Sequence, residues 1–471
     1  PWPSSPADLD AWTDIYGNPL YMFFILVSES GSPPTQPGGS DPGRWVPSDG
    51  SGPFRWEWVP YESEGPADPN RNPNPDPENS NAGDPVNMIN ANMILNQTDI
   101  VIPCPGMDLS LNRCGYSDLP YTNSALGRAW IHSYDWGLGQ SNEIYHLDGY
   151  DITNSCVRIR TGEGIPVTFD KVGTNVWQSY RDRSWRVERL TDGDYDLHRS
   201  GGYVWRFDTN GVLTRISDAW SNTVALSYTN IYPTNKLLRV EHGNGQYLNF
   251  SYQDNRLSRV DTPSADLYVT YSYNSDGELT NVTRTTSAGS FPTIYAWGTG
   301  TNPLSHVVTQ RVNAIGEVFL YGYATNASGE LLPRCTSLVV SSNYYQQSTA
   351  FFTNSSYSTV TFQRGNTNQV YEYHYQTNSL YIEGVYGPGG TNLQTLFHRD
   401  LIRLNVTNTV VRDLSAGDSM STIRLFDEGL NGRHPTNEGF GYNSTPANFW
   451  AYSWDTNWQV LTSIIDPEGH K

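Results

Sequence analysis

The residue groups that could support catalysis are sparse in this sequence. It contains no phosphate-binding loop, no His-Glu-x-x-His zinc motif and no Gly-x-Ser-x-Gly nucleophile motif. The nine histidines are scattered, and His132 lies beside Trp130 and Asp135. A histidine in such a setting is more often a hydrogen-bonded packing residue than a general base. We therefore predict no catalytic residue and no enzymatic activity.

Two further stretches could be mistaken for sites. Gly417-Asp-Ser419 is similar to the start of a GDS-type hydrolase motif, but no α/β pattern surrounds it to expose a nucleophile. Residues 68–78 offer alternating Asp, Asn and Glu oxygens, yet four prolines interrupt the turn that an EF-hand needs. We expect no metal and no cofactor, and we interpret residues 63–83 as an extended or disordered spacer.

The four cysteines are too far apart for a Cys-x-x-Cys zinc site. Cys104 and Cys114 could lie on neighbouring strands and form a disulfide, but isolated buried thiols are an equal alternative, as they are for Cys156 and Cys335.

The composition indicates the elements that must carry these residues. Aromatic residues make up 13% of the 471 residues and charged residues only 16%, with 42 glycines and 30 prolines. This balance favours many short strands joined by turns, and no stretch shows helical periodicity, so we predict an all-β protein. The net charge of -19 argues against nucleic acid or an anionic membrane as a partner.

One phrase, Leu-x-x-Val with close variants, recurs about every 20 to 25 residues, which indicates stacked supersecondary units. It begins at Leu213, Leu237, Leu257, Leu279 and Leu304. Each copy is followed by a polar turn and a strand that closes on Tyr or Trp, so the unit is a β-hairpin. Asn210-Gly211 and Asp276-Gly277 predict two-residue primed turns.

The spacing within the phrase is unusual for a strand. Leu213 and Ile216 are three residues apart, so on a regular strand they would face opposite sides. Either both faces of the sheet are covered, or a bulge lies between the two residues.

The unit from Gly211 to Tyr228 reads Gly-x-Leu-x-x-Ile-x-Asp, then a turn, then a closing Tyr. It resembles the YD repeat of the Rhs (rearrangement hot spot) family, also found in toxin-complex shells and teneurins. Upstream, Thr98-Asp-Ile-Val-Ile-Pro103, Leu109-Ser-Leu-Asn-Arg113 and Leu126-Gly-Arg-Ala-Trp130 are similar to the entry domain before those repeats, although the family usually has glycine at the position of Cys104. The resemblance covers about residues 84–323 and 455–471. It implies strands wound into a spiral wall or hollow shell that often encloses a toxic C-terminal segment.

The family also has an Asp-Pro-x-Gly-Leu motif at which the toxin segment is cut from the shell. Asp466-Pro-Glu-Gly469 is similar to it, with His470 in place of leucine. An ordinary repeat turn is the alternative, and the agreement with the local repeat phase favours it.

Together these patterns predict six regions. They are a Trp- and Pro-rich β segment (1–62), the spacer (63–83), the entry domain (84–190), YD repeats (191–330), degenerate repeats or an insertion (331–454), and the start of a further repeat (455–471). The most apolar run, from Leu20 to Val27, is too short to span a bilayer as a helix and is expected to be a buried strand.

The expected function is structural. The resemblance implies a β-shell portion of a larger secreted or surface-associated bacterial protein, which encloses or carries a C-terminal effector beyond Lys471. An adhesion or carbohydrate-binding module with a cell-surface or glycan ligand, or a subunit of an extracellular fibre that pairs with neighbouring subunits, is the alternative.

Overall fold

The computed structural model describes part of the chain. The described ranges are 43–47, 56–60, 81–82, 86–117, 124–147, 150–179, 185–229, 236–299, 306–324, 334–340, 346–351, 357–364, 367–376, 381–388, 392–399, 406–426, 434–443, 448–455 and 460–471. The chain divides into two compact units, residues 1–63 and 64–471. The Leu20–Val27 run and the Asp/Asn-rich stretch at 68–78 lie outside the described residues.

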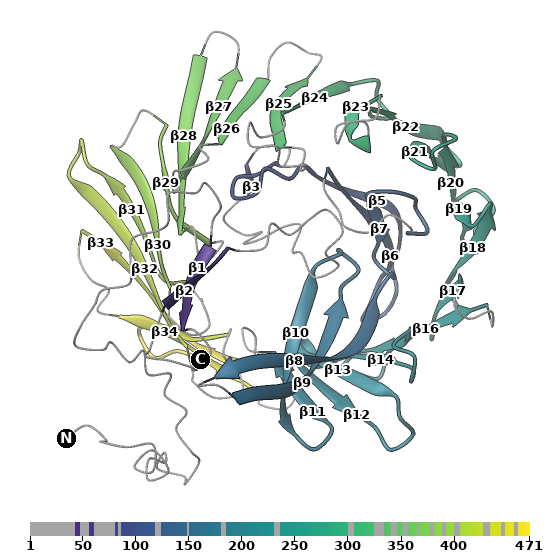
Figure 1. Cartoon of the computed structure of the whole chain (residues 1–471), viewed down its shortest axis with the longest axis horizontal. Coiled ribbons are helices and arrows are strands. Elements are labelled where there is room, and N and C mark those ends of the chain that lie inside the picture. The colour runs from purple at the N-terminus through teal and green to yellow at the C-terminus, as the bar shows by residue number, and fades with distance from the viewer. Residues whose placement is uncertain are drawn as a thin grey trace. The chain divides into compact units, whose positions relative to one another are not determined.

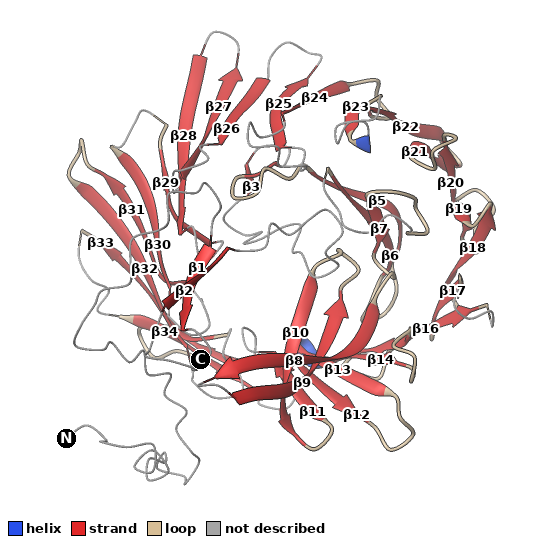
Figure 2. Ribbon diagram, viewed as in Figure 1, coloured by secondary structure: helices blue, strands red, loops and turns tan. Residues whose placement is uncertain are grey.

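The regular elements of the described residues are almost all strands, with very little helix, as Figure 2 shows, so the prediction of an all-β protein is confirmed. The 3-10 helix η2 (Ser200–Gly202) is one of the short exceptions. In the first unit β1 (Gly43–Pro47) pairs with β2 (Trp56–Pro60). In the second, β3 (Asn81–Ala82) pairs with β4 (Val86–Asn87), and β5 (Ile94–Ile102), β6 (Leu109–Tyr116) and β7 (Trp130–His132) form a three-stranded sheet.

All later strands belong to one long antiparallel sheet, in which each strand pairs with the next along the chain. They are β8 (Gly137–Leu147), β9 (Tyr150–Arg160), β10 (Pro166–Gly173), β11 (Val176–Ser179), β12 (Arg186–Arg189), β13 (Tyr195–Arg199), β14 (Tyr203–Phe207), β15 (Leu213–Ser217), β16 (Thr223–Tyr228), β17 (Leu237–His242), β18 (Tyr247–Gln253), β19 (Arg256–Asp261), β20 (Tyr268–Tyr273) and β21 (Leu279–Thr286). The sheet continues through β22 (Gly289–Trp297), β23 (Val308–Val312), β24 (Val318–Ala324), β25 (Arg334–Val340), β26 (Gln346–Phe351), β27 (Tyr357–Arg364), β28 (Thr367–Gln376), β29 (Tyr381–Tyr386), β30 (Leu393–Arg399), β31 (Val406–Asp413), β32 (Asp418–Phe426), β33 (Pro435–Tyr442), β34 (Phe449–Trp454) and β35 (Leu461–Ile465). At the two ends of this sheet, β8 pairs with β9 and β35 pairs with β34. Among the described residues, no residue pairs connect β35 to β8.

A β-bulge explains the spacing of the repeated phrase. In β19, Leu257 faces Tyr252 and Arg259 faces Ser251, so Ser258 is an extra residue in the ladder. Because the bulge adds one residue between them, Leu257 and Val260 point to the same side of the sheet, and both are fully buried. The bulge was one of the two alternatives left open by the sequence, and it removes the need to cover both faces.

The same bulge continues through the second half of the sheet, where the phrase is no longer legible. The register skips one residue in β15, β17, β19, β21, β23, β25, β29, β31, β33 and β35. In most copies the extra residue is Thr or Ser, and its hydroxyl donates to a carbonyl of the preceding strand. Thr280 Oγ1 lies 3.0 Å from the carbonyl oxygen of Ser272, and Thr462 Oγ1 lies 2.9 Å from that of Ser453.

The aromatic residue that closes each unit joins neighbouring strands. Tyr273 of β20 faces Leu279 of β21, and its hydroxyl donates to the carbonyl oxygen of Leu257 in β19 at 2.8 Å. Trp454 of β34 makes the equivalent bond to Pro435 at 3.0 Å through its indole nitrogen. Tyr and Trp suit this position because each offers a large apolar surface and one polar donor.

The turns differ from the primed type that the sequence predicts. Asp208 bonds to Val212 through its backbone N–H, so three residues form the loop, and only the third, Gly211, has a positive φ, of 78°. Asp208 Oδ1 also accepts the backbone N–H groups of Asn210 and Val212, both at 2.9 Å. This side-chain acceptor favours a three-residue loop that ends in a left-handed glycine.

The β5–β7 sheet lies on the concave side of the long sheet, as Figure 1 shows. Backbone hydrogen bonds join the block from 86 to 136 to widely separated strands of the sheet, since the N–H of Leu257 donates to Ala125 and that of Cys335 donates to Ala91. The main apolar core lies between the two layers. The block predicted as an entry domain therefore contributes to both sheets, because β8–β12 continue the long sheet. Among the described residues, no helix is long and apolar enough to cross a membrane.

Candidate functional site

A buried ion pair lies where β5 and β6 meet the repeats. Asp99 is the extra residue of a bulge in β5, and this bulge directs its carboxylate towards Arg113 of β6. Arg113 Nε donates to both carboxylate oxygens, at 2.9 and 3.0 Å. The two side chains are only 2% and 5% exposed, so the pair is inside the protein and is weakly screened by salt.

Two tyrosines of the long sheet complete this cluster, which we call the junction cluster (Asp99, Arg113, Tyr271 and Tyr295). The hydroxyl of Tyr271 in β20 donates to Asp99 Oδ2 at 2.8 Å, and Arg113 Nη1 donates to the hydroxyl of Tyr295 in β22 at 2.7 Å. The Arg113 guanidinium also lies 5.0 Å from the ring centre of Trp130. The cluster thus fastens the inner sheet to two repeats by charge-assisted hydrogen bonds.

The electrostatics of the junction cluster favour the charged arginine. Burial by itself lowers the pKa of Arg113, but Asp99 and Tyr295 outweigh that effect and the net pKa is raised. Burial, together with the Asp99 carboxylate, raises the pKa of Tyr271 well above its ordinary value. The tyrosine therefore remains a neutral donor at physiological pH.

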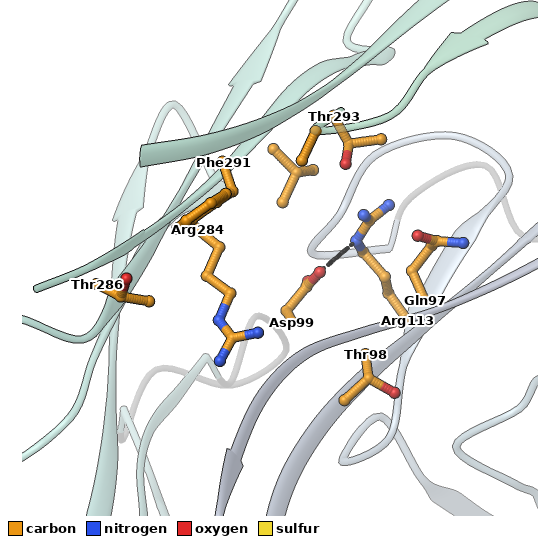
Figure 3. Close-up of a pocket in the computed structure, with 10 residues that line it drawn as sticks. Gln97, Thr98, Asp99, Arg113, Arg284, Thr286, Phe291 and Thr293 are labelled. Atoms are coloured by element: carbon orange, nitrogen blue, oxygen red, sulfur yellow. Dashed lines mark hydrogen bonds and ion pairs between the residues drawn. The ribbon is translucent and has the colours of Figure 1, made fainter. Parts of the chain in front are cut away.

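A cavity of about 400 Å³ adjoins the junction cluster. Figure 3 shows Arg113 and Asp99 on one side of it and Arg284 extending from β21 on the other. Its remaining lining residues come from β5, from β21 and β22, and from the turn after β23: Gln97, Thr98, Val282, Thr286, Phe291, Thr293 and Ala314.

A second feature lies on the inner face at the other end of the sheet. Cross-strand partners point to the same face, so the registers Met420–Tyr442, Glu438–Trp450 and Tyr452–Ile464 place these residues together. The large apolar side chains there are well exposed: Met420 52%, Phe440 58%, Tyr442 66%, Trp450 38%, Leu461 42% and Ile464 41%. We call this set the uncovered inner face.

His132 and Ser419, which the sequence analysis considered as possible catalytic residues, both make hydrogen-bond contacts with neighbouring residues. His132 is 3% exposed, its Nδ1 accepts the backbone N–H of Tyr134 at 3.2 Å, and burial lowers its pKa. Ser419 lies in the β31–β32 hairpin, where its hydroxyl is 3.3 Å from Asn443 Oδ1. These contacts hold both side chains in place.

None of the four cysteines forms a disulfide in the structure. Cys114 packs with Ile94, Tyr116 and Ile131, whereas Cys104 packs against the main core, so the two residues take part in different clusters. The disulfide alternative is not the arrangement that the structure has.

The turn at Asp466 has the geometry of the other repeat turns. Asp466 Oδ1 accepts the backbone N–H groups of Glu468 and His470, at 2.9 and 2.8 Å, and Gly469 has a φ of 91°. His470 Nδ1 lies 2.9 Å from Asp466 Oδ2, which matches the contact between Asn274 and Glu278 in the β20–β21 turn.

Sequence reasoning missed the junction cluster and the cavity. One available signal was Arg113 in the alternating strand Leu109-Ser-Leu-Asn-Arg113, where it shares a face with Leu109 and Leu111. A buried arginine requires a buried acid, but the sequence does not say which acid.

Comparison with known proteins identifies one region of the chain. A family model described as "Domain of unknown function (DUF6531)" matches residues 83–164. Among matching solved structures is a porin-like protein from Bacteroides uniformis, with 12% identity and a TM-score of 0.20, covering 50% of this chain and 93% of that one. The comparison with curated proteins gave no match. The chain is therefore an all-β protein whose β4–β9 region resembles a domain family of undescribed function.

Proposed function

We propose that this chain is a structural, non-enzymatic wall segment of an Rhs-like YD-repeat protein. In this proposal the long sheet is part of a spiral shell of a secreted or cell-surface protein, and the shell encloses or carries a C-terminal effector. The repeated bulge supports the proposal, because a unit with one buried face must stack on copies of itself to form an extended wall.

The uncovered inner face is the observation that carries the proposal. The exposure of equivalent repeat positions differs along the sheet. Leu257 of β19 is fully buried beneath the β5–β7 layer, whereas Leu461 of β35 is 42% exposed. An apolar face of this kind is costly to leave in water, and large exposed patches mark interaction sites. A polypeptide held on the inner side of the wall would bury it.

The test is binding of the polypeptide that follows the repeats in the native protein, added as a separate chain. Phe440→Ser and Trp450→Ser are expected to weaken its binding at least tenfold, because aromatic anchors dominate interfaces. Leu425→Ser is the matched control, since Leu425 is 49% exposed but lies on the opposite face from Met420.

Salt dependence tests a second part of the proposal. If the charge of -19 helps to retain a basic cargo, the dissociation constant should rise with ionic strength. Binding that ignores salt would remove the electrostatic contribution, and equal losses for Leu425→Ser and Phe440→Ser would argue against an inner-face cargo.

An extracellular binding module or fibre subunit is the second candidate. The exposed rings of Phe440, Tyr442 and Trp450 could stack on sugars or pair with another copy of the chain. Binding of the intact chain to neutral glycans, or concentration-dependent growth in light scattering, would favour this candidate if either effect disappears in Trp450→Ser.

A further inference from the structure

The cavity beside the junction cluster has the size of a small-molecule site. Its volume of about 400 Å³ lies within the range of known ligand pockets. It lies between two layers, with β5 and β6 on one side and the β21–β22 hairpin on the other (Figure 3). The hydrogen bonds of the junction cluster fix the distance between these layers, so the cavity is preformed.

The charges lining the cavity leave one positive charge uncompensated. Asp99 neutralises Arg113. Arg284 lines the opposite side, and its guanidinium has no ion pair or side-chain hydrogen bond within the part of the chain that the structure describes. The whole chain carries a net charge of -19, so the local positive charge of this cavity is opposite in sign to that of the molecule. The local charge suits a ligand with one negative charge.

The neutral lining residues indicate what else the ligand carries. Phe291 is 41% exposed and presents an aromatic ring to the cavity wall. Thr293 and Thr286 add hydroxyl groups, and Gln97 adds an amide. A ring faces the apolar side of a sugar well, while hydroxyls and amides exchange hydrogen bonds with sugar hydroxyls.

We propose that this cavity binds a small hydroxylated monocarboxylate of the hexuronic acid type, with its carboxylate on Arg284 and its ring against Phe291. A guanidinium binds a carboxylate through two parallel hydrogen bonds, which fixes the orientation of the ligand. A sugar phosphate fits less well, because its second negative charge lies near Asp99 without a further cation. This inference does not depend on the proposed shell function.

The test is calorimetric and ligand-observed NMR titration of the whole chain with galacturonate and glucuronate. Galactose lacks the carboxylate, acetate lacks the ring, and galactose 6-phosphate carries the extra charge. The hexuronate should bind more tightly than all three. Loss of one charge-assisted hydrogen-bonding partner in Arg284→Gln should weaken hexuronate binding about tenfold or more.

Matched variants keep the result interpretable. Arg215 is also exposed and on a strand, but it does not line the cavity, so Arg215→Gln should leave the affinity unchanged. Phe291→Ala should weaken the binding of galacturonate and leave the binding of acetate unchanged. Circular dichroism checks that each variant is folded. Equal binding of galactose and galacturonate, no hexuronate binding to the wild-type chain, or equal affinity in Arg284→Gln would overturn the proposal.

Discussion

The two ends of the long sheet share one hairpin geometry but differ in what covers their inner face. From β15 to β24 the phrase residues lie beneath the β5–β7 layer, and Leu213, Leu257, Val260 and Leu279 are fully buried. From β31 to β35 the bulge and the closing aromatic persist, yet Leu461 and Ile464 are 42% and 41% exposed. The hairpin geometry therefore belongs to the repeat itself, whereas burial depends on a second layer.

The junction cluster should be the most sensitive point of the covered end. Arg113→Met leaves the Asp99 carboxylate buried without its partner, so we expect the free energy of unfolding to fall by about 3–5 kcal/mol. Urea denaturation followed by circular dichroism measures the loss.

A double variant tests whether the loss comes from the unpaired charge. Asp99→Ala combined with Arg113→Met removes both charges and should recover part of the stability. If Arg113→Met is as stable as the wild-type chain, the junction cluster does not fasten the two layers.

Matched leucines compare the two ends directly. Leu257→Ala removes a fully buried side chain and should lower the free energy of unfolding by about 2–5 kcal/mol. Leu461→Ala, at the same repeat position, should lower it by less than about 1 kcal/mol. Thermal unfolding of the two variants measures both. Equal destabilisation would mean that the inner face of β35 is covered in solution.

The bulge hydroxyls should have the same effect at both ends. Thr280→Val and Thr462→Val each remove a hydroxyl hydrogen bond, of 3.0 and 2.9 Å, and keep the side-chain volume. We expect each variant to lower the free energy of unfolding by about 0.5–1 kcal/mol. The two losses should be similar, because neither hydrogen bond depends on the β5–β7 layer. A loss confined to Thr280→Val would show that the bulge of β35 is not held by its own hairpin.

The smallest expected change in stability near neutral pH comes from Cys335, which occupies in β25 the position that leucine takes in the repeated phrase. Burial raises the pKa of Cys335 from 9.0 to about 12. Because the folded pKa is above the unfolded one, its contribution to stability is complete below about pH 9 and is lost as pH rises towards 12. Urea midpoints measured from pH 8 to 11 should fall less steeply in Cys335→Ala than in the wild-type chain. Parallel slopes would contradict the assigned pKa.

Much of the architecture could be predicted because it is encoded locally. The strand Tyr203–Phe207 and the aromatic closures follow from β-branched and aromatic runs between glycine and asparagine turns. The turn type was mispredicted at Asn210-Gly211, since the residue that determined it was Asp208, two positions before Asn210. The bulge was left as one of two alternatives because a register shift is a property of paired strands and not of one strand.

The candidate sites could not be predicted in the same way. Asp99 and Arg113 are close in sequence, but Tyr271 and Tyr295 reach them from strands far along the chain. In the sequence, Arg284 and Phe291 read as ordinary residues of an exposed hairpin. They line a cavity only because β5 and β6 lie opposite them in the structure.

The sequence by itself determined the all-β class and the hairpin repeat, because strand periodicity and turn chemistry act over a few residues. Only the tertiary structure decided which repeats are covered, where the ion pair is buried and which arginine faces a cavity. Those features depend on how the β5–β7 layer packs on the long sheet, and contacts between residues far apart in the chain leave no periodic pattern in either segment.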